Sequence, residues 1–518
     1  MANSVTVPRP RAAALTPLHF LVLLSLALAA LIWGATFIFG SQGLQFQRYL
    51  ALLGFYGVSS SVFIVARIRR AKLQLFEIPV FITTMFFLQF GLVPLGNFID
   101  PTQISIHLSA NGDELVQALS YVILGMMLFW IGSELARYKA GDRIAQGLGT
   151  QRILPEKHKG RVLLPFGVLY TLGFIIKIYL LKTNLYSYVA FGDVISNRSS
   201  LQVLNYLSQF GTLALIIAAI ERYRDRNDPL WRILFIVALS TEILWGLISG
   251  MKALVLQNFL AVAIVSSFIM KRLNLRWFFI LFFGLVLLYP ISNAYRAVVN
   301  RGDVQVTSFE GAAKAGQMAF SQVGEGESTE GDLWRDGLHN TLLRMDLLTS
   351  VAEVLSLGPR ASFVKGDTQW WMLPFYPFVP RFLWPSKPVL GEDARFTIAL
   401  TGDSGNPATM RLSSTAITYP GDLCLQFGLW GIPVGMFVLG IITQWFTNRV
   451  SGGVKPRDLF VYTAIFLFGF KYETDAFSML TGLIKLSVIL YILGLLIYKV
   501  STQQKRLATP FRALARRS

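Results

Sequence analysis

The stretch VQALSYVILGMMLFWIGSELA, residues 116–136, decides the fold class of this chain. It is apolar over about the 20 residues that an α-helix needs to cross a bilayer. Basic residues follow it closely: Arg137, Lys139 and Arg143. An apolar run closed by basic side chains is typical of a membrane helix that ends at the cytoplasmic face. This segment therefore predicts a helical membrane protein.

The composition of the whole chain indicates the same class. Residues of the set AVILMFWYC make up 53% of the 518 residues, only 15% are charged, and the mean hydropathy is +0.52. A soluble domain carries about 25% charged residues, and its core could not bury so much apolar surface. We therefore expect an all-α polytopic membrane protein.

Similar apolar stretches recur along the chain and predict about 12 transmembrane helices. In chain order the predicted spans are 18–39, 49–66, 78–96, 116–136, 163–182, 203–220, 231–249, 252–270, 275–293, 423–446, 458–472 and 478–499. The first is longer than the core of a signal peptide and offers no convincing cleavage site, so we interpret it as a span.

Lysine and arginine alternate from loop to loop. They gather at the N-terminus, in the loop after each even-numbered span and in the C-terminal tail, whereas the other short loops are poor in them. The loop after span 2, for example, holds Arg67, Arg69, Arg70 and Lys72. Because cytoplasmic loops carry the positive charge, both termini are predicted to be cytoplasmic. The alternation explains most of the net charge of +18, so no nucleic-acid partner is expected.

One long segment, residues 294–422, separates spans 9 and 10 and must lie outside the cytoplasm. It divides the chain into a membrane region 1–293 with spans 1–9, an extracytoplasmic loop, and a membrane region 423–518 with spans 10–12 and a basic tail. Within the loop, apolar residues at helical spacing predict an amphipathic helix over 334–355. The aromatic- and proline-rich stretch 370–388 predicts an irregular shelf at the membrane–water interface.

The motifs that would hold a cofactor or a metal do not occur in the sequence. There is no GxxxxGK[ST] loop, and no GxGxxG is followed by a suitable acidic residue. Cys424 is the single cysteine, and the four histidines lie too far apart for a local ligand motif. The cytoplasmic loops are also too short for a nucleotide-sugar-binding domain. We expect no metal and no cofactor, and a substrate that arrives within the membrane or from outside.

Several basic residues stand at the predicted outer face, where positive charge is not expected. They are Lys177, Lys182, Lys252, Lys471, Lys485, Arg198 and Arg296. A charge near a span usually faces the bundle interior, forms a pair or marks a substrate path. As a group these residues indicate a phosphate- or pyrophosphate-binding face; the alternative for each lysine is extension to lipid headgroups. Glu242, within span 7, is the one acid deep in the predicted membrane region; a catalytic role is one alternative, and pairing with a span lysine is the one we expect.

A general base that acts from outside must be an acid or a histidine of the external segments. The residues of this kind include Asp193, Asp336, Asp346, Asp422, Glu473, Asp475 and His339. A base must reach the proton that it removes, and a sequence does not show reach. We select Asp422, His339 and Asp336 as the candidate catalytic residues.

Three motifs resemble those of a known family, both in their order along the chain and in their positions relative to the predicted spans. They are SGMKALVL at 249–256, VPRFLWPSKP at 379–388 and YPGDLCLQFGLWGIPVGMFVLG at 419–440. Together they look like the bacterial oligosaccharide repeat unit polymerases, the Wzy or O-antigen polymerase family.

The second motif of the family, Pro-Arg-x-x-Trp-Pro-x-Lys-Pro, is matched in full. The matching residues are Pro380, Arg381, Trp384, Pro385, Lys387 and Pro388. The first motif has Lys252 where the family usually has an arginine, and the third has Asp422 where the family usually has a glutamate. Arg344 also resembles a recurrent arginine of the loop helix.

The resemblance implies a lipid-carrier-dependent glycosyltransferase of the GT-C type in the bacterial inner membrane. Such enzymes transfer a glycan from polyprenyl diphosphate to a sugar hydroxyl of another lipid-linked repeat unit. The implied partners are polyprenyl-diphosphate-linked oligosaccharides, membrane lipids, a chain-length regulator and a flippase. With the outer-face charges above, the candidate substrate-binding residues are Lys252, Arg296, Arg344, Arg381, Lys387 and Arg198.

Two alternatives stay open at this point. A polysaccharide or O-antigen ligase uses the same donor and also carries a long external loop. A 12-span secondary transporter or flippase is the alternative from another class. A major-facilitator arrangement would place its long loop in the cytoplasm between two six-span halves, whereas the long segment here is external and follows span 9.

The loop charges predict that residues near 330 and near 150 lie on opposite sides of the membrane. A reporter that is active only outside the cytoplasm should be active when fused at 330 and inactive when fused at 150. A reporter active only in the cytoplasm should give the reverse. Fusions that report the same side at both positions would contradict the topology.

Overall fold

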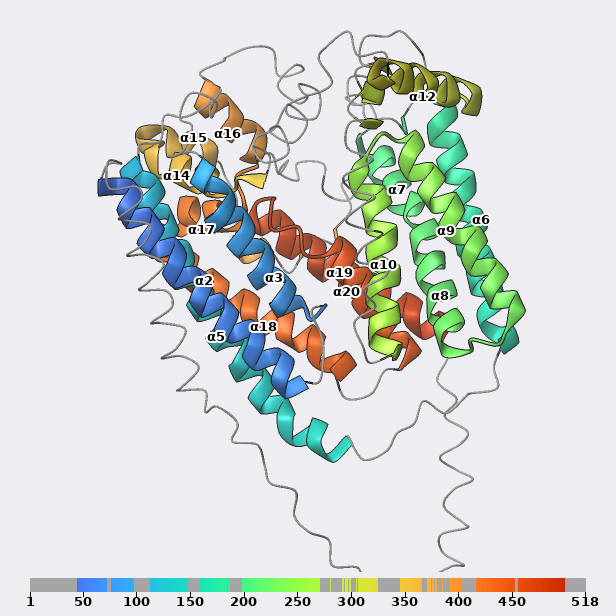
Figure 1. Cartoon of the computed structure of the whole chain (residues 1–518), viewed down its shortest axis with the longest axis horizontal. Helices are drawn as coiled ribbons and strands as arrows, with labels where there is room; N and C mark the ends of the chain where they lie inside the picture. The colour runs from blue at the N-terminus through green and yellow to red at the C-terminus, as the bar shows by residue number, and fades with distance from the viewer. Residues whose placement is uncertain are drawn as a thin grey trace, which may run out of the picture.

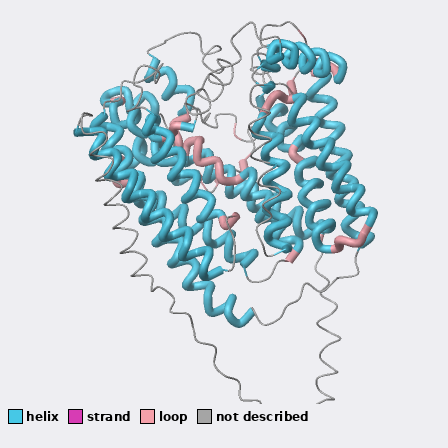
Figure 2. Tube along the Cα trace, viewed as in Figure 1, coloured by secondary structure: helices cyan, strands magenta, loops and turns pink. Residues whose placement is uncertain are grey.

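The computed structural model describes residues 44–71, 76–96, 112–147, 159–183, 185–186, 198–270, 306–324, 345–365, 392–401, 416–451 and 455–498, with short pieces between 280 and 304 and between 370 and 384. Within these residues all regular structure is helical, and Figure 2 shows no strand among them. The predicted all-α class is confirmed.

The helices form two bundles that flank a central pair (Figure 1). The first bundle contains α2 (Leu44–Ala71), α3 (Ile78–Phe86), α5 (Gly112–Gly147) and α18 (Gly431–Ser451); the π-helical turn η1 (Phe87–Leu92) and the 3-10 turn η2 (Val93–Leu95) continue α3. The second contains α6 (Lys159–Lys182), α7 (Arg198–Ser208), α8 (Phe210–Arg224), α9 (Pro229–Ile248) and α10 (Lys252–Met270). Between them lie α19 (Pro456–Phe468) and α20 (Ala476–Ile497).

Shorter helices cover one end of the molecule, which we call the loop end. Over the second bundle lies α12 (Phe309–Gly324), and over the first lie α14 (Leu348–Ser356), α15 (Ala361–Lys365), α16 (Glu392–Thr401) and α17 (Tyr419–Phe427). Two 3-10 turns, η5 (Gly358–Arg360) and η6 (Trp370–Met372), belong to the same end. Most of this end is formed by the segment that the sequence predicts to be extracytoplasmic.

Among the described residues, eight helices are long and apolar enough to cross a membrane. They are Leu44–Arg67, Ile78–Leu95, Gly112–Arg137, Val162–Lys182, Val203–Arg224, Pro229–Ile248, Lys252–Met270 and Ala476–Ile497. Each coincides with one of the twelve predicted spans, so the protein is a multi-pass membrane protein. The predicted span 18–39 and nearly all of 275–293 lie outside the described residues.

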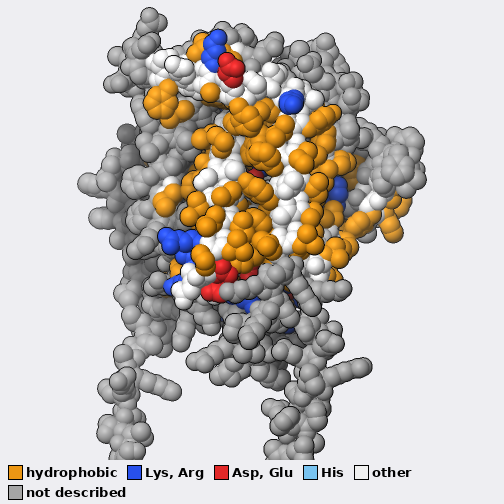
Figure 3. Space-filling view, turned by 90° about the vertical axis from the view of Figure 1, so that its right-hand side faces the viewer, with side chains coloured by type: hydrophobic (Ala, Val, Ile, Leu, Met, Phe, Trp, Pro, Cys, Tyr) orange, Lys and Arg blue, Asp and Glu red, His pale blue; other side chains and the backbone are white. Residues whose placement is uncertain are grey.

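The outer face of the second bundle is apolar. In α6, Leu164 and Ile175 expose 73% and 53% of their surface, and in α9 Ile233 exposes 59%. Figure 3 shows an apolar band over this side of the molecule, with most charged side chains near its two ends. Such a band suits contact with lipid chains, because a soluble protein does not expose a continuous apolar surface of this size.

The predicted span 423–446 is not one helix. It contains the end of α17 and most of α18, separated by a turn at Gly428, Leu429 and Trp430. Gly428 has φ 73°, a left-handed conformation that a residue with a Cβ adopts at a cost. This glycine therefore ends α17 and lets the chain turn into α18.

The predicted span 458–472 is the shortest of the twelve, and its helix is shorter still. Its helix, α19, has 13 residues and ends at Phe468. A helix of that length is about 20 Å long, whereas the hydrocarbon core of a bilayer is about 30 Å thick. The non-helical residues 469–475 complete the connection to α20.

Helices α5 and α18 pack with their backbones in contact. A Cβ added at Gly440 of α18 would lie 2.1 Å from the carbonyl oxygen of Phe129, and one added at Gly132 of α5 would lie 2.3 Å from that of Phe437. Small residues allow this close approach, which is a common basis for helix association in membranes.

A buried arginine joins four segments of the first bundle. Arg67 of α2 is 2% exposed; its Nη1 donates to Oε1 of Gln444 in α18 (2.8 Å), and its Nη2 donates to the hydroxyl of Ser133 in α5. Its Nε lies 2.9 Å from Oε1 of Glu134, and its Nη1 lies 3.5 Å from Oε2 of Glu77, directly before α3. Arg67 is therefore a packing residue of a helix, not a residue of the cytoplasmic loop as the sequence analysis predicts.

The close packing of α5 and α18 predicts that Gly440→Ala lowers the stability of the protein by about 1–3 kcal/mol, because the new methyl group collides with a backbone carbonyl. The measurement is thermal unfolding in detergent micelles. The matched control is Gly167→Ala in α6, where a Cβ would meet nothing within 4 Å. The control should be neutral or slightly stabilising; equal effects of the two substitutions would refute the packing argument.

Candidate functional site

The corner between α9 and α10, at the loop end, is held by residues from the end of the ninth predicted span and just after it. Gly250 turns the chain with φ 67°, and a Cβ there would lie 3.0 Å from the ring of Tyr295. The hydroxyl of Tyr295 donates to the carbonyl oxygen of Ile248 (2.9 Å). The hydroxyl of Ser292 and Nε of Arg296 both donate to the carbonyl oxygen of Gly250, each at 2.8 Å. These bonds satisfy carbonyl groups that the end of α9 leaves without helical partners.

Two of the predicted substrate-binding residues meet at this corner, which we call the basic corner. Lys252 is the first residue of α10. Arg296 is held by its hydrogen bond to the carbonyl oxygen of Gly250, which lies two positions before Lys252 in the chain. Both side chains are half-buried. The structure thus brings Lys252 and Arg296 together from distant parts of the sequence, while their role in binding stays a prediction.

A second charged group lies buried within the same bundle. Nζ of Lys177 in α6 lies 2.5 Å from Oε1 of Glu242 in α9, and the hydroxyl of Thr212 in α8 donates to Oε2 of Glu242 (2.9 Å). A Cβ at Gly211 would lie 2.1 Å from Oε1 of Glu242, so only a glycine leaves room for the pair. The expected pairing of Glu242 with a span lysine is confirmed. Because its charge is neutralised inside the bundle, Lys177 is not part of the basic corner.

Asp422, a candidate catalytic residue, ties α17 to the start of α20. Its side chain is 0% exposed, and its Oδ2 accepts from the backbone N–H groups of Ala476 (2.8 Å) and Phe477 (3.4 Å). The N-terminus of a helix favours a negative charge, so this position stabilises the carboxylate. Asp475 caps the same helix by accepting from the N–H of Ser478 (2.6 Å).

These contacts give Asp422 a structural role at the junction of α17 and α20. A substrate hydroxyl cannot contact a carboxylate that is 0% exposed unless the residues around it move. The function of Asp422 as a base therefore stays a prediction, with the added requirement of a conformational change.

The predicted aromatic shelf covers this junction. The ring of Trp370 packs against Phe427 of α17 and Phe477 of α20, with centroid distances of 5.1 and 5.4 Å. Tyr376 also packs against Phe477, at 5.3 Å. Trp371, in contrast, is 68% exposed. The described part of the shelf contains a 3-10 turn, further turns and a bend, as the density of prolines predicts.

A buried acid that the sequence analysis does not select lies beside this junction. Glu353 of α14 is 2% exposed, and burial raises the pKa of its carboxyl group to about 8, with a further contribution from the negative charge of Asp346. Asp346 accepts from the N–H and the hydroxyl of Thr349 at the start of α14. Its neighbour Leu347 donates its N–H to the carbonyl oxygen of Gln89 in the π-helical turn η1 (3.2 Å). A carboxyl group with a pKa near neutrality can exchange protons at physiological pH.

The remaining predicted site residues cannot be placed. Asp336, His339, Arg344, Arg381 and Lys387 lie outside the described residues. Arg198 is the first residue of α7, but its side chain is not described. Within the part of the chain that the structure describes, no three Asp, Glu, His or Cys side chains gather as metal ligands.

Fold and site together define a multi-pass helical membrane protein with a basic corner and buried acids at its loop end. Residues 173–503 match DUF8712, a domain of unknown function, and the chain belongs to this family. The matched region includes the basic corner, the Lys177–Glu242 pair and the junction of α17 and α20. No solved structure matches the chain.

The pKa of Glu353 predicts a pH dependence of stability. The carboxyl group holds its proton more tightly in the folded protein than in the unfolded chain. Its contribution to stability is therefore complete below about pH 4.5 and is lost as the pH rises through about 8. Between these limits we expect the loss to reach about 5 kcal/mol.

Glu353→Gln keeps the shape of the side chain and removes the proton exchange. It should unfold at a temperature close to that of the wild type at pH 5 and at a clearly higher temperature at pH 8.5. Glu310→Gln, at an exposed acid of α12, is the control and should follow the wild type at both pH values. If the unfolding temperatures of the wild type and of Glu353→Gln changed in parallel with pH, the raised pKa of Glu353 would be contradicted.

Proposed function

We propose that the protein is a glycosyltransferase that polymerises polyprenyl-diphosphate-linked oligosaccharide repeat units for a cell-surface polysaccharide such as O-antigen, capsule or exopolysaccharide. In this proposal it is a Wzy-type polymerase with a GT-C-like arrangement. It lies in the bacterial inner membrane with both termini in the cytoplasm, and the loop end faces outward. The motifs at 249–256, 379–388 and 419–440 support this assignment by resemblance.

The observation that carries the proposal is the basic corner. A lipid pyrophosphate is an anion held at the membrane surface, so its binding site needs cations that are fixed at the end of a membrane helix. Lys252 begins such a helix, and the guanidinium of Arg296 is fixed beside it by a hydrogen bond to a backbone carbonyl group. Arginine and lysine are the residues that bind phosphate groups most often.

The proposed reaction breaks the bond between the anomeric carbon of the donor glycan and the oxygen of the lipid diphosphate. The hydroxyl oxygen of the acceptor sugar forms the new bond to that carbon, and its proton passes to a base. Negative charge grows on the leaving diphosphate, where Lys252 and Arg296 would stabilise it. Because both substrates are anchored in the membrane, holding them side by side supplies a further part of the rate.

For the base, His339 and Asp336 stay candidates of this proposal; both lie outside the described residues. The buried contacts of Asp422 support a role in positioning the loop end over the junction of α17 and α20. A chain-length regulator and a flippase are the protein partners that the proposal implies.

A ligase is the alternative that shares the same donor. It would move a finished polymer to a different acceptor and would not extend a chain of repeat units. The product therefore separates the two reactions, and a transporter would form no covalent product at all.

The test uses a deletion strain of the source bacterium, which should accumulate its own unpolymerised lipid-linked repeat units. Purified protein and these lipids should give a ladder of polymers on gels. Lys252→Ala and Arg296→Ala should each slow the reaction by about 30- to 1000-fold, as expected for loss of one group that stabilises the developing charge. Lys252→Arg should keep most of the activity, because it restores the side chain that the family usually carries.

Ser292→Ala is the matched control. It removes a hydrogen bond to the carbonyl oxygen of Gly250 that has the same length as the bond from Arg296, but it removes no charge. If Ser292→Ala is as slow as Arg296→Ala at equal protein level, the effect of Arg296 is structural. Ladders like those of the wild type from both alanine variants would overturn the proposed pyrophosphate site.

A further inference from the structure

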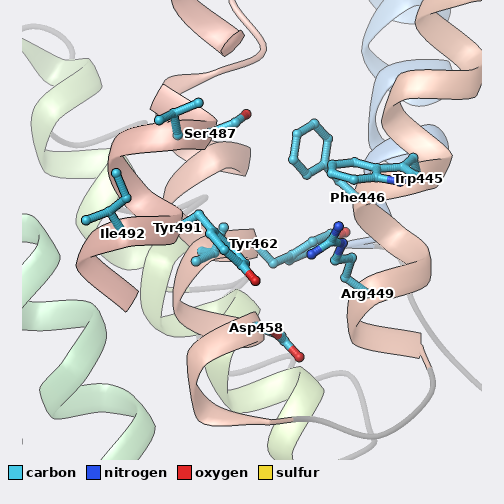
Figure 4. Close-up of a pocket in the computed structure, with 10 residues that line it drawn as sticks. Trp445, Phe446, Arg449, Asp458, Tyr462, Ser487, Tyr491 and Ile492 are labelled. Atoms are coloured by element: carbon cyan, nitrogen blue, oxygen red, sulfur yellow. The ribbon is translucent and has the colours of Figure 1, made fainter. Parts of the chain in front are cut away.

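A pocket of about 420 Å³ lies between α18, α19 and α20, at the end of the molecule opposite to the loop end (Figure 4). It lies near the end of α18 at Ser451 and the start of α19 at Pro456, on the side that the loop charges predict to be cytoplasmic. Trp445 and Arg449 come from α18, Asp458 from α19, and Tyr491 from α20. None of these residues contributes to the basic corner.

One end of the pocket is cationic and aromatic. The guanidinium carbon of Arg449 lies 4.3 Å from the ring centroid of Trp445 and 6.0 Å from that of Tyr491. Arg457, from the first turn of α19, lies 5.4 Å from the same tyrosine ring. Asp458 is paired with Arg457, with 3.1 Å between Oδ1 and Nε, so the acid does not cancel the charge of Arg449.

The other end of the pocket is mainly apolar and extends along the helices; its polar side chain, Ser487, donates its hydroxyl to the carbonyl oxygen of Leu483. Phe446 lies in the turn before Arg449, and Val488 lies in the turn before Tyr491, so both are further from the helix ends. Val488 is 42% exposed, which leaves its side chain accessible. Tyr462 closes the back wall and is not available as a ligand group: its hydroxyl donates to the carbonyl oxygen of Phe76 and accepts from the N–H of Ile78.

We propose that this pocket binds an anionic phospholipid of the adjacent leaflet. The phosphodiester group would contact Arg449 between the rings of Trp445 and Tyr491, and an acyl chain would lie along Phe446 and Val488. The cationic end of the pocket lies near the helix ends and the apolar end lies deeper. This order matches the headgroup and the acyl chain of a phospholipid. A zwitterionic lipid fits less well, because its headgroup brings a positive charge toward Arg449. Tryptophan, tyrosine and arginine are also the side chains that suit the headgroup level of a membrane.

The experiment uses the full-length protein in detergent, with phosphatidylglycerol as the anionic probe and phosphatidylcholine as the zwitterionic one. Native mass spectrometry measures how many lipids stay bound, and thermal unfolding measures the protection they give. Phosphatidylglycerol should stay bound and protect at lower concentration than phosphatidylcholine. Arg449→Gln should weaken the binding of phosphatidylglycerol by about tenfold, as expected for loss of a hydrogen bond to a charged group.

Two further variants separate the pocket from the general membrane surface. Val488→Trp fills the apolar end without changing a charge and should also weaken binding. Arg232→Gln removes an exposed charge near the start of α9, outside the pocket, and should bind phosphatidylglycerol like the wild type. Equal protection by the two lipids, or equal effects of Arg449→Gln and Arg232→Gln, would overturn the proposal. So would protection by soluble glycerol 3-phosphate, or a co-purified polyprenyl phosphate in place of a phospholipid.

Discussion

Inside a bilayer a charged side chain must find its partner within the protein, because no water is present to solvate it. Among the described residues, two buried ionic groups that join different helices meet this requirement, one in each bundle. Arg67 joins α2, α5 and α18 to the residue before α3, and Lys177 pairs with Glu242 between α6 and α9. Loss of one partner from such a group costs about 3–5 kcal/mol, because the other charge stays buried. These pairings decide which helices are neighbours, and the glycines around them decide how closely the helices approach.

The same requirement shapes the loop end, where the helices are interrupted. The break between α17 and α18 and the short α19 leave backbone groups that a continuous helix would have satisfied. Asp422 and Asp475 accept the first N–H groups of α20, and the residues around Tyr295 satisfy the carbonyl groups at the end of α9. Irregular backbone at the membrane level is tolerated only where protein or a watery cavity surrounds it. The interruptions therefore place the basic corner and the buried acids at the same end of the molecule.

The two ends of the molecule present different chemistry to the membrane. At the loop end Arg296 is held by a backbone carbonyl group, beside the start of a membrane helix at Lys252. At the opposite end Arg449 is held by aromatic rings and opens toward the lipid-facing surface. The first arrangement suits the proposed lipid pyrophosphate during a reaction, whereas the second suits a lipid that stays bound. The two proposals rest on separate residues, so the failure of one leaves the other standing.

The sequence by itself determined the helical membrane class, eight spans that the structure contains, and the pairing of Glu242 with a lysine. These features follow from local apolarity and from the cost of an unpaired charge. It did not reveal the break at Gly428 or the burial of Arg67, because an apolar window ignores where one residue turns the chain or which helix lies next to it. Glu353 was missed although an acid within the apolar run SVAEVLS is a signal, since burial depends on α14 packing against other helices. Only the tertiary structure could bring Lys252 to Arg296 and fold Asp422 onto α20, because these contacts join residues that are dozens of positions apart in the chain.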